Sequence, residues 1–355
     1  MKIAIVTNIP TPYRNPVYSI VDKQDSIESL VFFCSRSEPN RKWQNLNIQF
    51  NHKFLSNKTD RFIHYNWNIY KELSKFKPDV IITSGFNPTM LLAWLWSLLN
   101  GKRHIPFLDS NLESESKLGY LHKLTRKIVF RTSSAFIGAS NKTLDLYRSY
   151  NVKETALFKS CLTIDNKMFE KKQDIKRKFD LLFCGQFIEG KNPIFFCKLA
   201  IRLKEKIPNI NLLLIGDGPL KEKCISELKN NDVSFTDAGF VQHTSLPKLY
   251  QTSKILIFPT SKDAWGLVAN EALASGVPVL VSKVAGVAEE LVIDNYNGYV
   301  FTELNLEKWH KKALCVLTDN ELREQFSNNA KESVQAYSFK AAAEGILKAI
   351  YFSKK

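Results

Sequence analysis

Short apolar runs alternate with longer amphipathic segments along the chain, and this alternation predicts its elements. In the first half, the apolar runs lie at residues 2–8, 28–34, 79–85, 103–109 and 134–140. Continuous apolar runs are typical of strands buried on both faces, and strands that alternate with helices form parallel sheets. We therefore expect an α/β fold in the first half, with a doubly wound, Rossmann-like parallel sheet covered by helices on both faces.

The second half repeats this alternation after a charged interruption. Residues 169–179 lack an apolar pattern and are expected to link an N-terminal domain, residues 1–168, to a C-terminal domain, residues 180–337. The expected elements of the second domain are strands at 180–185, 211–216, 254–259 and 277–282 and helices at 191–206 and 267–275. Residues 338–355 are expected to form a last helix that packs back on the first domain. Two such domains in series would face each other across a cleft, with ligands beyond the carboxyl ends of the strands.

The net charge is unevenly distributed between the two halves. Of a total of +15, residues 1–178 carry 29 Lys and Arg against 15 Asp and Glu, whereas residues 179–355 carry 21 against 20. A basic domain beside a neutral one suggests an anionic partner that only the first domain meets. We expect no nucleic acid, because no nucleic-acid-binding motif accompanies the charge. Anionic lipid headgroups, or an acceptor that carries a diphosphate, fit better, and a solvated basic face without a partner is the alternative.

The apolar runs are too short to place the chain across a membrane. The longest, residues 90–100, has about half of the roughly 20 residues that span a bilayer, and residues 3–6 are too short for an export signal. Its tryptophans, Trp94 and Trp96, are expected on a buried helix that touches the membrane surface. The six cysteines are scattered, without the spacing of a zinc site or a disulfide framework. We therefore expect a cytoplasmic protein, peripheral on the inner face of the cytoplasmic membrane.

Two carboxylates bracket the start of the helix that follows the strand at 254–259. Asp263 and Glu271 stand eight residues apart, with Trp265 and Gly266 between them. A loop that ends in glycine lets backbone amides approach a ligand, and a helix start favours an anion such as a diphosphate. Glu271 would accept hydrogen bonds from a ribose diol, and Asp263 from sugar hydroxyls. The alternative is a loop Asp and a surface Glu that bind nothing.

The run DAWGLVANEALASGVPV, which begins at Asp263, resembles the signature of the retaining glycosyltransferases of family 4, which have the GT-B fold. In that signature two acidic residues flank Phe-Gly-Leu, and Glu-Ala, a small residue, Gly and Pro-Val follow. Asp263 replaces the usual first Glu, and Trp265 the usual Phe. Three further matches follow the family's order: LLLIGDGPLKEK, AGFVQHTSLPKLYQTSKILIFPT and AGVAEELVIDNYNGYVF. The resemblance covers roughly residues 180–302.

This resemblance implies a donor site in the second domain. Lys191 stands where the family has a lysine that grips the donor diphosphate, but Gln186 occupies the position of the family's arginine, which halves a charge-assisted grip. A solvated lysine at a helix start is the alternative for Lys191. The expected donor-binding residues are Gly185, Gln186, Lys191, Gly216, Gly218, Pro219, Trp265, Gly266, Leu267 and Glu271.

In the first domain, candidate residues follow two expected strands. Tyr13 and Arg14 lie in the loop after the first strand, where the family has a glycine-rich loop near the phosphates; a surface ion pair is the alternative for Arg14. Asp109 ends the strand at 103–109, where the family often has a histidine that faces the reacting sugar. Asp109 or Glu113 would position the acceptor hydroxyl or stabilise oxocarbenium-like charge. A helix N-cap followed by first-turn acids is the alternative for these carboxylates. The expected catalytic residues are Asp109, Lys191, Asp263 and Glu271.

The resemblance implies transfer of a hexose or N-acetylhexosamine, with retention, from a nucleoside-diphosphate sugar to a lipid-linked saccharide acceptor during synthesis of a bacterial surface glycan. No metal or other cofactor is expected, because the sequence lacks an Asp-x-Asp motif and Lys191 with loop amides would stabilise the leaving diphosphate. Two alternatives stay open. A nonhydrolysing sugar-nucleotide epimerase uses the same paired-domain fold, and Gln186 with the missing histidine suits a noncatalytic sugar-nucleotide-binding subunit. A Rossmann dehydrogenase is disfavoured, because no G-x-G-x-x-G opens either domain.

Overall fold

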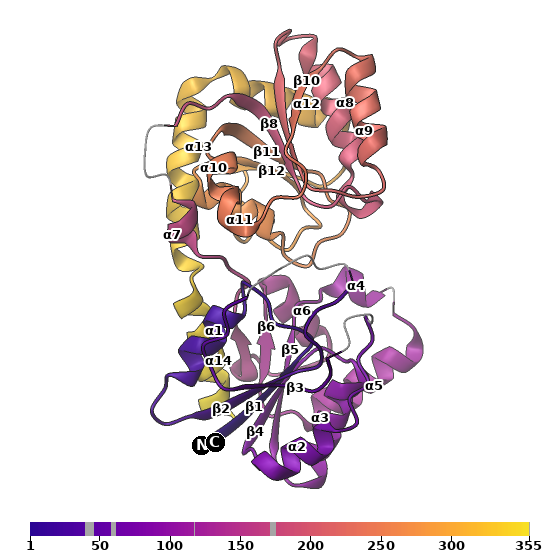
Figure 1. Ribbon diagram of the computed structural model, residues 1–355, viewed down its shortest axis with the longest axis vertical. Helices are drawn as coiled ribbons and strands as arrows, with labels where there is room; N and C mark the ends of the chain where they lie inside the picture. The colour runs from indigo at the N-terminus through magenta and orange to yellow at the C-terminus, as the bar shows by residue number, and fades with distance from the viewer. Residues whose placement is uncertain (40–45, 58–61, 117, 171–174, 355) are drawn as a thin grey trace. The chain divides into compact units, whose positions relative to one another are not determined.

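The computed structural model describes residues 1–39, 46–57, 62–116, 118–170 and 175–354. The chain divides into two units, one formed by Met1–Thr163 with Phe339–Lys355 and the other by Ile164–Ser338. Each unit contains one parallel sheet with helices packed on it (Figure 1). The division falls after Thr163, so the residues expected as a linker, 169–179, group with the second unit.

The first unit has a seven-stranded sheet in the order β3-β2-β1-β4-β5-β6-β7. Its strands are β1 (Lys2–Thr7), β2 (Glu28–Phe33), β3 (His52–Phe54), β4 (Val80–Ser84), β5 (Arg103–Leu108), β6 (Phe136–Gly138) and β7 (Leu157–Lys159). Its helices are α1 (Asn15–Asp22), α2 (Ile69–Phe76), α3 (Pro88–Leu99), α4 (Leu112–Ser116), α5 (Tyr120–Thr132), α6 (Asn141–Ser149) and α14 (Phe339–Phe352), with a 3₁₀ turn η1 (Glu154–Ala156). The strand order reverses between β1 and β4, which is where a parallel sheet opens a crevice beyond its carboxyl edge.

Helix α3 shows why this sequence gives a buried helix with one open side. Pro88 at its first turn has the fixed φ that starts a helix. Met90, Ala93 and Trp96 follow at helical spacing and are buried in the core against β4 and α2. Trp96 is only 3% exposed, so this tryptophan packs inside the unit, as expected for a buried helix, and is not itself placed to touch a membrane surface. The indole of Trp94 donates to the hydroxyl of Thr132 at 2.9 Å and so joins α3 to α5.

The second unit has a six-stranded sheet in the order β10-β9-β8-β11-β12-β13, which reverses between β8 and β11. Its strands are β8 (Phe179–Cys184), β9 (Asn211–Ile215), β10 (Ser234–Asp237), β11 (Ser253–Phe258), β12 (Val279–Ser282) and β13 (Gly298–Phe301). Its helices are α7 (Asn166–Phe169), α8 (Pro193–Lys204), α9 (Lys221–Asn230), α10 (Leu246–Tyr250), α11 (Leu267–Ala274), α12 (Leu306–Thr318) and α13 (Asn320–Ser333). The 3₁₀ turns are η2 (Glu189–Lys191), η3 (His243–Ser245) and η4 (Val334–Ala336).

The last helix, α14, belongs to the first unit although it follows the whole second unit in sequence (Figure 1). It packs against α1 and β7. A Cβ on Gly345 would lie 1.9 Å from the carbonyl oxygen of Lys159, so only glycine permits this close approach to β7. Near the end of the helix, the hydroxyl of Tyr351 lies 3.0 Å from that of Ser26. The described helices include none that is long and apolar enough to cross a membrane.

Candidate active site

In the first unit, a cavity of about 300 Å³ opens at the carboxyl ends of β1, β4 and β5. Tyr13 and Arg14 from the loop after β1 line it, and so does Asp109, the residue after β5. Asp109 is exposed to solvent. The fold therefore gathers three of the residues that the sequence singled out in this unit.

The guanidinium of Arg14 is fixed against the wall of this cavity. Its Nη1 lies 3.3 Å from the carbonyl oxygen of Ser160 and 3.4 Å from that of Cys161, and the group sits 4.2 Å from the centre of the Phe107 ring. Burial lowers the pKa of Arg14, but an arginine stays charged in proteins. Because carbonyl oxygens carry no net charge, the cavity wall keeps a positive charge, which attracts the carboxylate of Asp109. These contacts differ from the surface ion pair that was the alternative for Arg14.

The two acids of α4 have different environments. Glu113 is exposed. Glu115 is buried, forms an ion pair with Arg126 of α5 and accepts a hydrogen bond from the hydroxyl of Tyr150. Glu115 therefore fastens α4 to its neighbours, and the exposed carboxylates near this edge are those of Asp109 and Glu113.

In the second unit, the glycines after β8 and β9 bring two loops into backbone contact. Gly216 has a φ of +129°, and a Cβ there would lie 1.9 Å from the carbonyl oxygen of Gly185. A Cβ on Gly218 would likewise lie 2.7 Å from the carbonyl oxygen of Phe187. Pro219 and Gln186 lie exposed beside this contact. The glycines that we expected to bind the donor therefore also allow the backbones of these two loops to pack in direct contact.

Lys191 and Asp263 come together although they are 72 positions apart in sequence. The turn η2 is anchored to the loop after β11, because the carbonyl oxygen of Gly190 accepts from the hydroxyl of Thr260 at 2.8 Å and from the amide of Ser261 at 3.0 Å. This places the ammonium of Lys191 in an ion pair with the carboxylate of Asp263, both groups being about one-fifth exposed. An ammonium held at this edge is available to an anionic ligand.

Gly266 is the N-cap of helix α11, and its φ of +108° suits glycine. A Cβ at this position would lie 2.5 Å from the ring of Phe258, so the helix start lies directly against the end of β11. The side chain of Trp265 is 1% exposed and packs 5.6 Å from the ring of Tyr337. Only the backbone of Trp265 is therefore placed to meet a ligand, whereas Leu267, the first residue of α11, is partly exposed.

Glu271 is buried one turn inside α11, with a 6% exposed side chain. The hydroxyl of Tyr250 donates to its Oε2 at 2.7 Å, and Nε2 of His243 lies 3.8 Å from its Oε1. Burial raises the pKa of Glu271 to about 7, and the hydrogen bond from Tyr250 opposes this rise. Burial also lowers the pKa of His243. Glu271 therefore changes its charge near neutral pH, at a place where charge is costly.

Sequence reasoning missed Tyr250 and His243 as neighbours of Glu271. Both precede β11, in α10 and η3, within a stretch that resembled the family as a whole. The positions of Tyr250 and His243 in the sequence do not indicate a contact with Glu271. A buried carboxyl group needs a hydrogen-bond donor, and this requirement is what could have suggested such neighbours. Within the described residues, no group of three or more His, Cys, Asp and Glu side chains is placed to hold a metal ion.

Comparison with known proteins finds a family model that is similar to the second unit. Residues 165–333 match the family model "Glycosyl transferases group 1". Over 151 residues the chain is 29% identical to the sulfoquinovosyl transferase SQD2 of Arabidopsis thaliana, covering 42% of this chain and 29% of that protein. Over 284 residues it is 24% identical to the Campylobacter jejuni GalNAc-alpha-(1->4)-GalNAc-alpha-(1->3)-diNAcBac-PP-undecaprenol alpha-1,4-N-acetyl-D-galactosaminyltransferase, covering 79% of this chain and 76% of that protein. The matches to the first curated relatives span less than half of those relatives' lengths, 29% and 46%.

Solved structures extend the likeness to the whole chain. The crystal structure of Anabaena HepE in complex with UDP aligns with a TM-score of 0.78 at 13% identity, over 99% of this chain and 100% of that chain. At this identity the likeness concerns the fold. The chain has the GT-B fold that its sequence predicted, with two Rossmann-like units built on parallel sheets of seven and six strands.

Proposed function

We propose that the protein is a retaining glycosyltransferase that moves a hexose or N-acetylhexosamine from a nucleoside-diphosphate sugar to a saccharide acceptor. The observation that carries this proposal is the grouping of Lys191, Asp263 and the start of α11 at the carboxyl edge of the second sheet, with Glu271 one turn further on. The family match over residues 165–333 covers all of these residues and supports the same reaction class.

In this proposal the donor diphosphate binds at the start of α11. The first amides of a helix are unpaired and carry partial positive charge, which favours an anion. Gly266 lets the helix start lie directly against the end of β11, and Lys191 adds a full charge at the same edge of the sheet. The ion pair with Asp263 holds the ammonium of Lys191 in place until a phosphate oxygen shares it. Glu271 receives the ribose diol, because its carboxyl group lies behind the helix start.

The same residues stabilise the leaving group. As the bond between sugar and diphosphate breaks, negative charge grows on the diphosphate, and Lys191 with the α11 amides lowers the energy of that state. The proposed reaction assigns this role to no metal ion. Asp263 orients sugar hydroxyls. Asp109, at the cavity of the first unit, positions the acceptor hydroxyl beside Tyr13 and Arg14.

The acceptor in this proposal is a saccharide linked to a lipid through diphosphate, for a bacterial surface glycan made at the cytoplasmic face of the membrane. The positive charge of residues 1–178 supports an anionic acceptor. The name of the Campylobacter jejuni relative contains a PP-undecaprenol saccharide, which is an acceptor of this chemistry.

A panel of nucleoside-diphosphate sugars tests the proposal. One nucleoside-diphosphate sugar should raise the thermal unfolding temperature, and NMR should show its sugar group on an acceptor with unchanged anomeric configuration.

Lys191→Ala and Glu271→Gln should each lower transfer by about 100-fold with the fold intact, since each removes charge stabilisation or donor contacts worth roughly 3 kcal/mol. Conversion of the donor sugar without any acceptor would indicate the epimerase, and binding without transfer or donor hydrolysis would indicate a noncatalytic subunit. Either result would replace this proposal.

A further inference from the structure

Helix α5 carries two parallel rows of exposed side chains with different chemistry. Tyr120, Leu124 and Ile128 repeat every four residues and are 77%, 39% and 46% exposed; we call them the apolar row. Leu121 lies beside this row and is 74% exposed. Side chains that recur every four residues lie on the same face of a helix, so these groups face solvent together.

The second row of α5 is basic. Lys123, Lys127 and Arg131 also repeat every four residues, and all three are exposed. Lys123 and Lys127 each precede a member of the apolar row, and Arg131 follows one helical turn after Lys127. We call them the basic row. None of them forms an ion pair with an acidic side chain in the part of the chain that the structure describes. Val129 and Phe130 form the opposite, buried face that holds α5 on the sheet.

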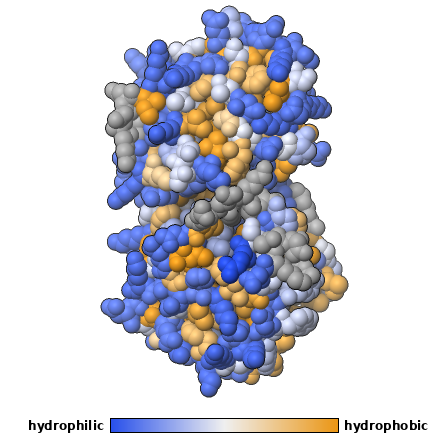
Figure 2. Space-filling view, viewed as in Figure 1, coloured by the Kyte–Doolittle hydropathy of each residue, from blue (hydrophilic) through white to orange (hydrophobic). Residues whose placement is uncertain are grey.

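Helix α3, which a hydrogen bond joins to α5, also carries exposed apolar side chains. The bond between Trp94 and Thr132 joins the two helices, and Leu95 and Leu98, on the open side of α3, are 39% and 48% exposed. Figure 2 shows hydrophobic residues gathered over α5 at the edge of the first unit. Exposed apolar side chains that gather on one side of a protein often mark an interaction site. We call this surface, with the two rows, the α3–α5 face.

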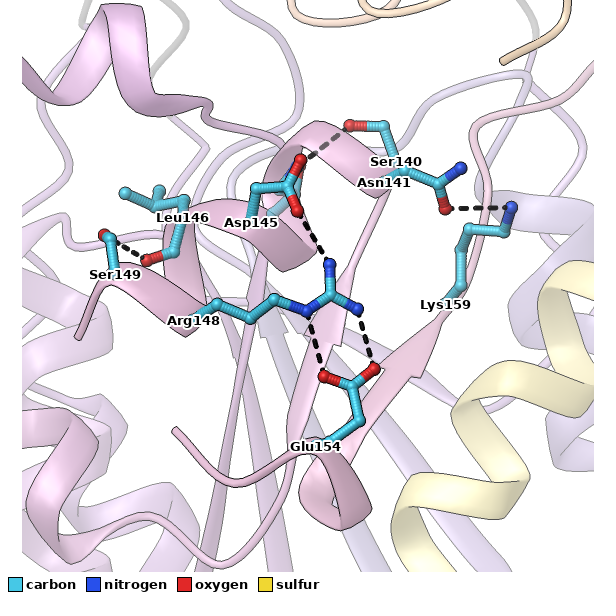
Figure 3. A network of polar contacts seen from close by, with 9 residues as sticks. Ser140, Asn141, Asp145, Leu146, Arg148, Ser149, Glu154 and Lys159 are labelled. Atoms are coloured by element: carbon cyan, nitrogen blue, oxygen red, sulfur yellow. Dashed lines mark hydrogen bonds and ion pairs between the residues drawn. The ribbon is translucent and has the colours of Figure 1, made fainter. Parts of the chain in front are cut away.

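A cavity beside the basic row concentrates its charge. It has a volume of about 710 Å³, and its lining includes Lys127 and Arg131 of α5 and Lys153 after α6. Glu154, the residue after Lys153, already has a cationic partner, as Figure 3 shows: Arg148 donates two hydrogen bonds to it, of 2.9 and 2.7 Å, and a third of 2.7 Å to Asp145. The cavity therefore offers three positive charges to an anion.

We propose that the α3–α5 face docks on an anionic phospholipid bilayer, with the apolar row and Leu121 in the interfacial region and the basic row and its cavity on headgroup phosphates. An apolar row beside a basic row is the pattern of helices that lie in the membrane interface. A protein partner would equally cover the apolar row, but three adjacent cations without acidic partners match a surface of phosphates. The docking does not depend on the proposed transferase activity. Only its use, which is to bring a lipid-linked acceptor toward the cavity at Asp109, rests on that proposal.

Vesicle sedimentation without any nucleotide sugar tests the docking separately from the activity. The protein is mixed with vesicles of phosphatidylcholine alone or of equal parts phosphatidylcholine and phosphatidylglycerol. We expect strong binding only to the second kind, falling steeply with added salt because salt screens the headgroup charge. Lys123→Gln with Lys127→Gln should lower the partition coefficient about 30-fold, from roughly fivefold per lysine near an anionic surface. Leu121→Gln with Leu124→Gln should lower it by on the order of tenfold or more.

Matched variants of the second unit separate this face from overall charge and hydrophobicity. Lys223→Gln with Lys229→Gln removes two exposed lysines from α9, and Ile293→Gln with Leu304→Gln removes two apolar side chains that are 43% and 39% exposed. Both controls should bind like the wild-type protein. Failure of the wild-type protein to bind phosphatidylglycerol vesicles would overturn the proposal, as would equal loss in the control variants. A lipid-free dimer that the Leu121 and Leu124 changes dissociate, seen by light scattering, would identify a second copy as the occupant instead.

Discussion

At the scale of single residues, Glu271 is a buried carboxyl group that can ionise. Its carboxyl group has one strong hydrogen-bond donor, Tyr250, and its pKa rises to about 7 from an ordinary value of 4.5. Between these two values the folded chain holds a proton that the unfolded chain has lost. The free energy of unfolding therefore falls as the pH rises through this window, by about 3 kcal/mol in total.

Replacing Glu271 by glutamine should remove this pH dependence. The glutamine oxygen still accepts from Tyr250, but it cannot ionise. The wild-type protein should lose about 2–3 kcal/mol more stability than Glu271→Gln between pH 5 and pH 8. Urea unfolding at both values measures the difference. Parallel stability curves for the two proteins would mean that Glu271 is ionised throughout.

Tyr250 acts on the proposed reaction through Glu271. Tyr250→Phe removes the hydrogen bond to the carboxylate, so the pKa of Glu271 should rise further, by roughly one to two units. If the ionised carboxylate receives the ribose, the rising limb of the pH–rate profile should move to higher pH by the same amount. Tyr299→Phe, at a buried tyrosine of β13, is the matched control. A lower rate with an unmoved profile would leave Tyr250 with a packing role only.

At the scale of elements, the site depends on loops that approach each other through glycine. A methyl group at Gly216 would meet the carbonyl oxygen of Gly185 at 1.9 Å, and the backbone there has a positive φ. Gly216→Ala should therefore destabilise the second unit by about 2 kcal/mol or more. Gly190→Ala, in the neighbouring loop, meets no atom within 4 Å and should leave stability nearly unchanged. Chemical denaturation compares the two, and similar losses would contradict the contact.

The elements that the sequence predicted are those with long or strongly patterned runs. The buried strands β1, β4, β8 and β11 stood out because their apolar runs are continuous. By contrast, β3, β7, β10 and β13 have only three or four residues each, and their stability comes from pairing with a neighbouring strand. Such segments carry too little local pattern to be seen without the sheet.

The candidate site was predictable where it lies within one segment. Asp263, Gly266 and Glu271 belong to one loop and helix, so the sequence alone could propose an anion site there, from the glycine before the helix and from the resemblance to the family 4 signature. The pairing of Lys191 with Asp263 and the contact of Arg14 with the carbonyl oxygens at Ser160 and Cys161 join distant parts of the chain. Tertiary packing alone determines these contacts. It also determines the burial of Trp265 against Tyr337, which the local sequence does not indicate.

At the scale of the whole molecule, the first unit is built from two separate pieces of the chain. Five side chains of α14 that are fully buried against it are Ala342, Ala343, Ile346, Ala349 and Ile350. A fragment of residues 1–163 should therefore expose apolar surface, bind a hydrophobic dye and unfold without a cooperative transition.

A circularly permuted chain that contains α14 should restore the cooperative unfolding that the fragment lacks. Met1 donates from its amino group to the carbonyl oxygen of Ser26 at 3.0 Å, and Tyr351 contacts the hydroxyl of the same residue, so the two ends of the chain lie close together (Figure 1). A protein with residues 339–355, a short Gly/Ser linker and then residues 1–163 should unfold cooperatively. Equal behaviour of the fragment and the rearranged chain in calorimetry would show that α14 is dispensable.

The late position of α14 also has a consequence during synthesis. A ribosome must make all of residues 164–338 before the helix that completes the first unit emerges, which takes about 10–35 s at ordinary speeds of translation. The second unit is continuous and can fold while it emerges, whereas α1 and β7 wait uncovered for their last neighbour. In the cell, the half of the protein made first is therefore finished last, and newly made chains should depend on chaperones through that interval.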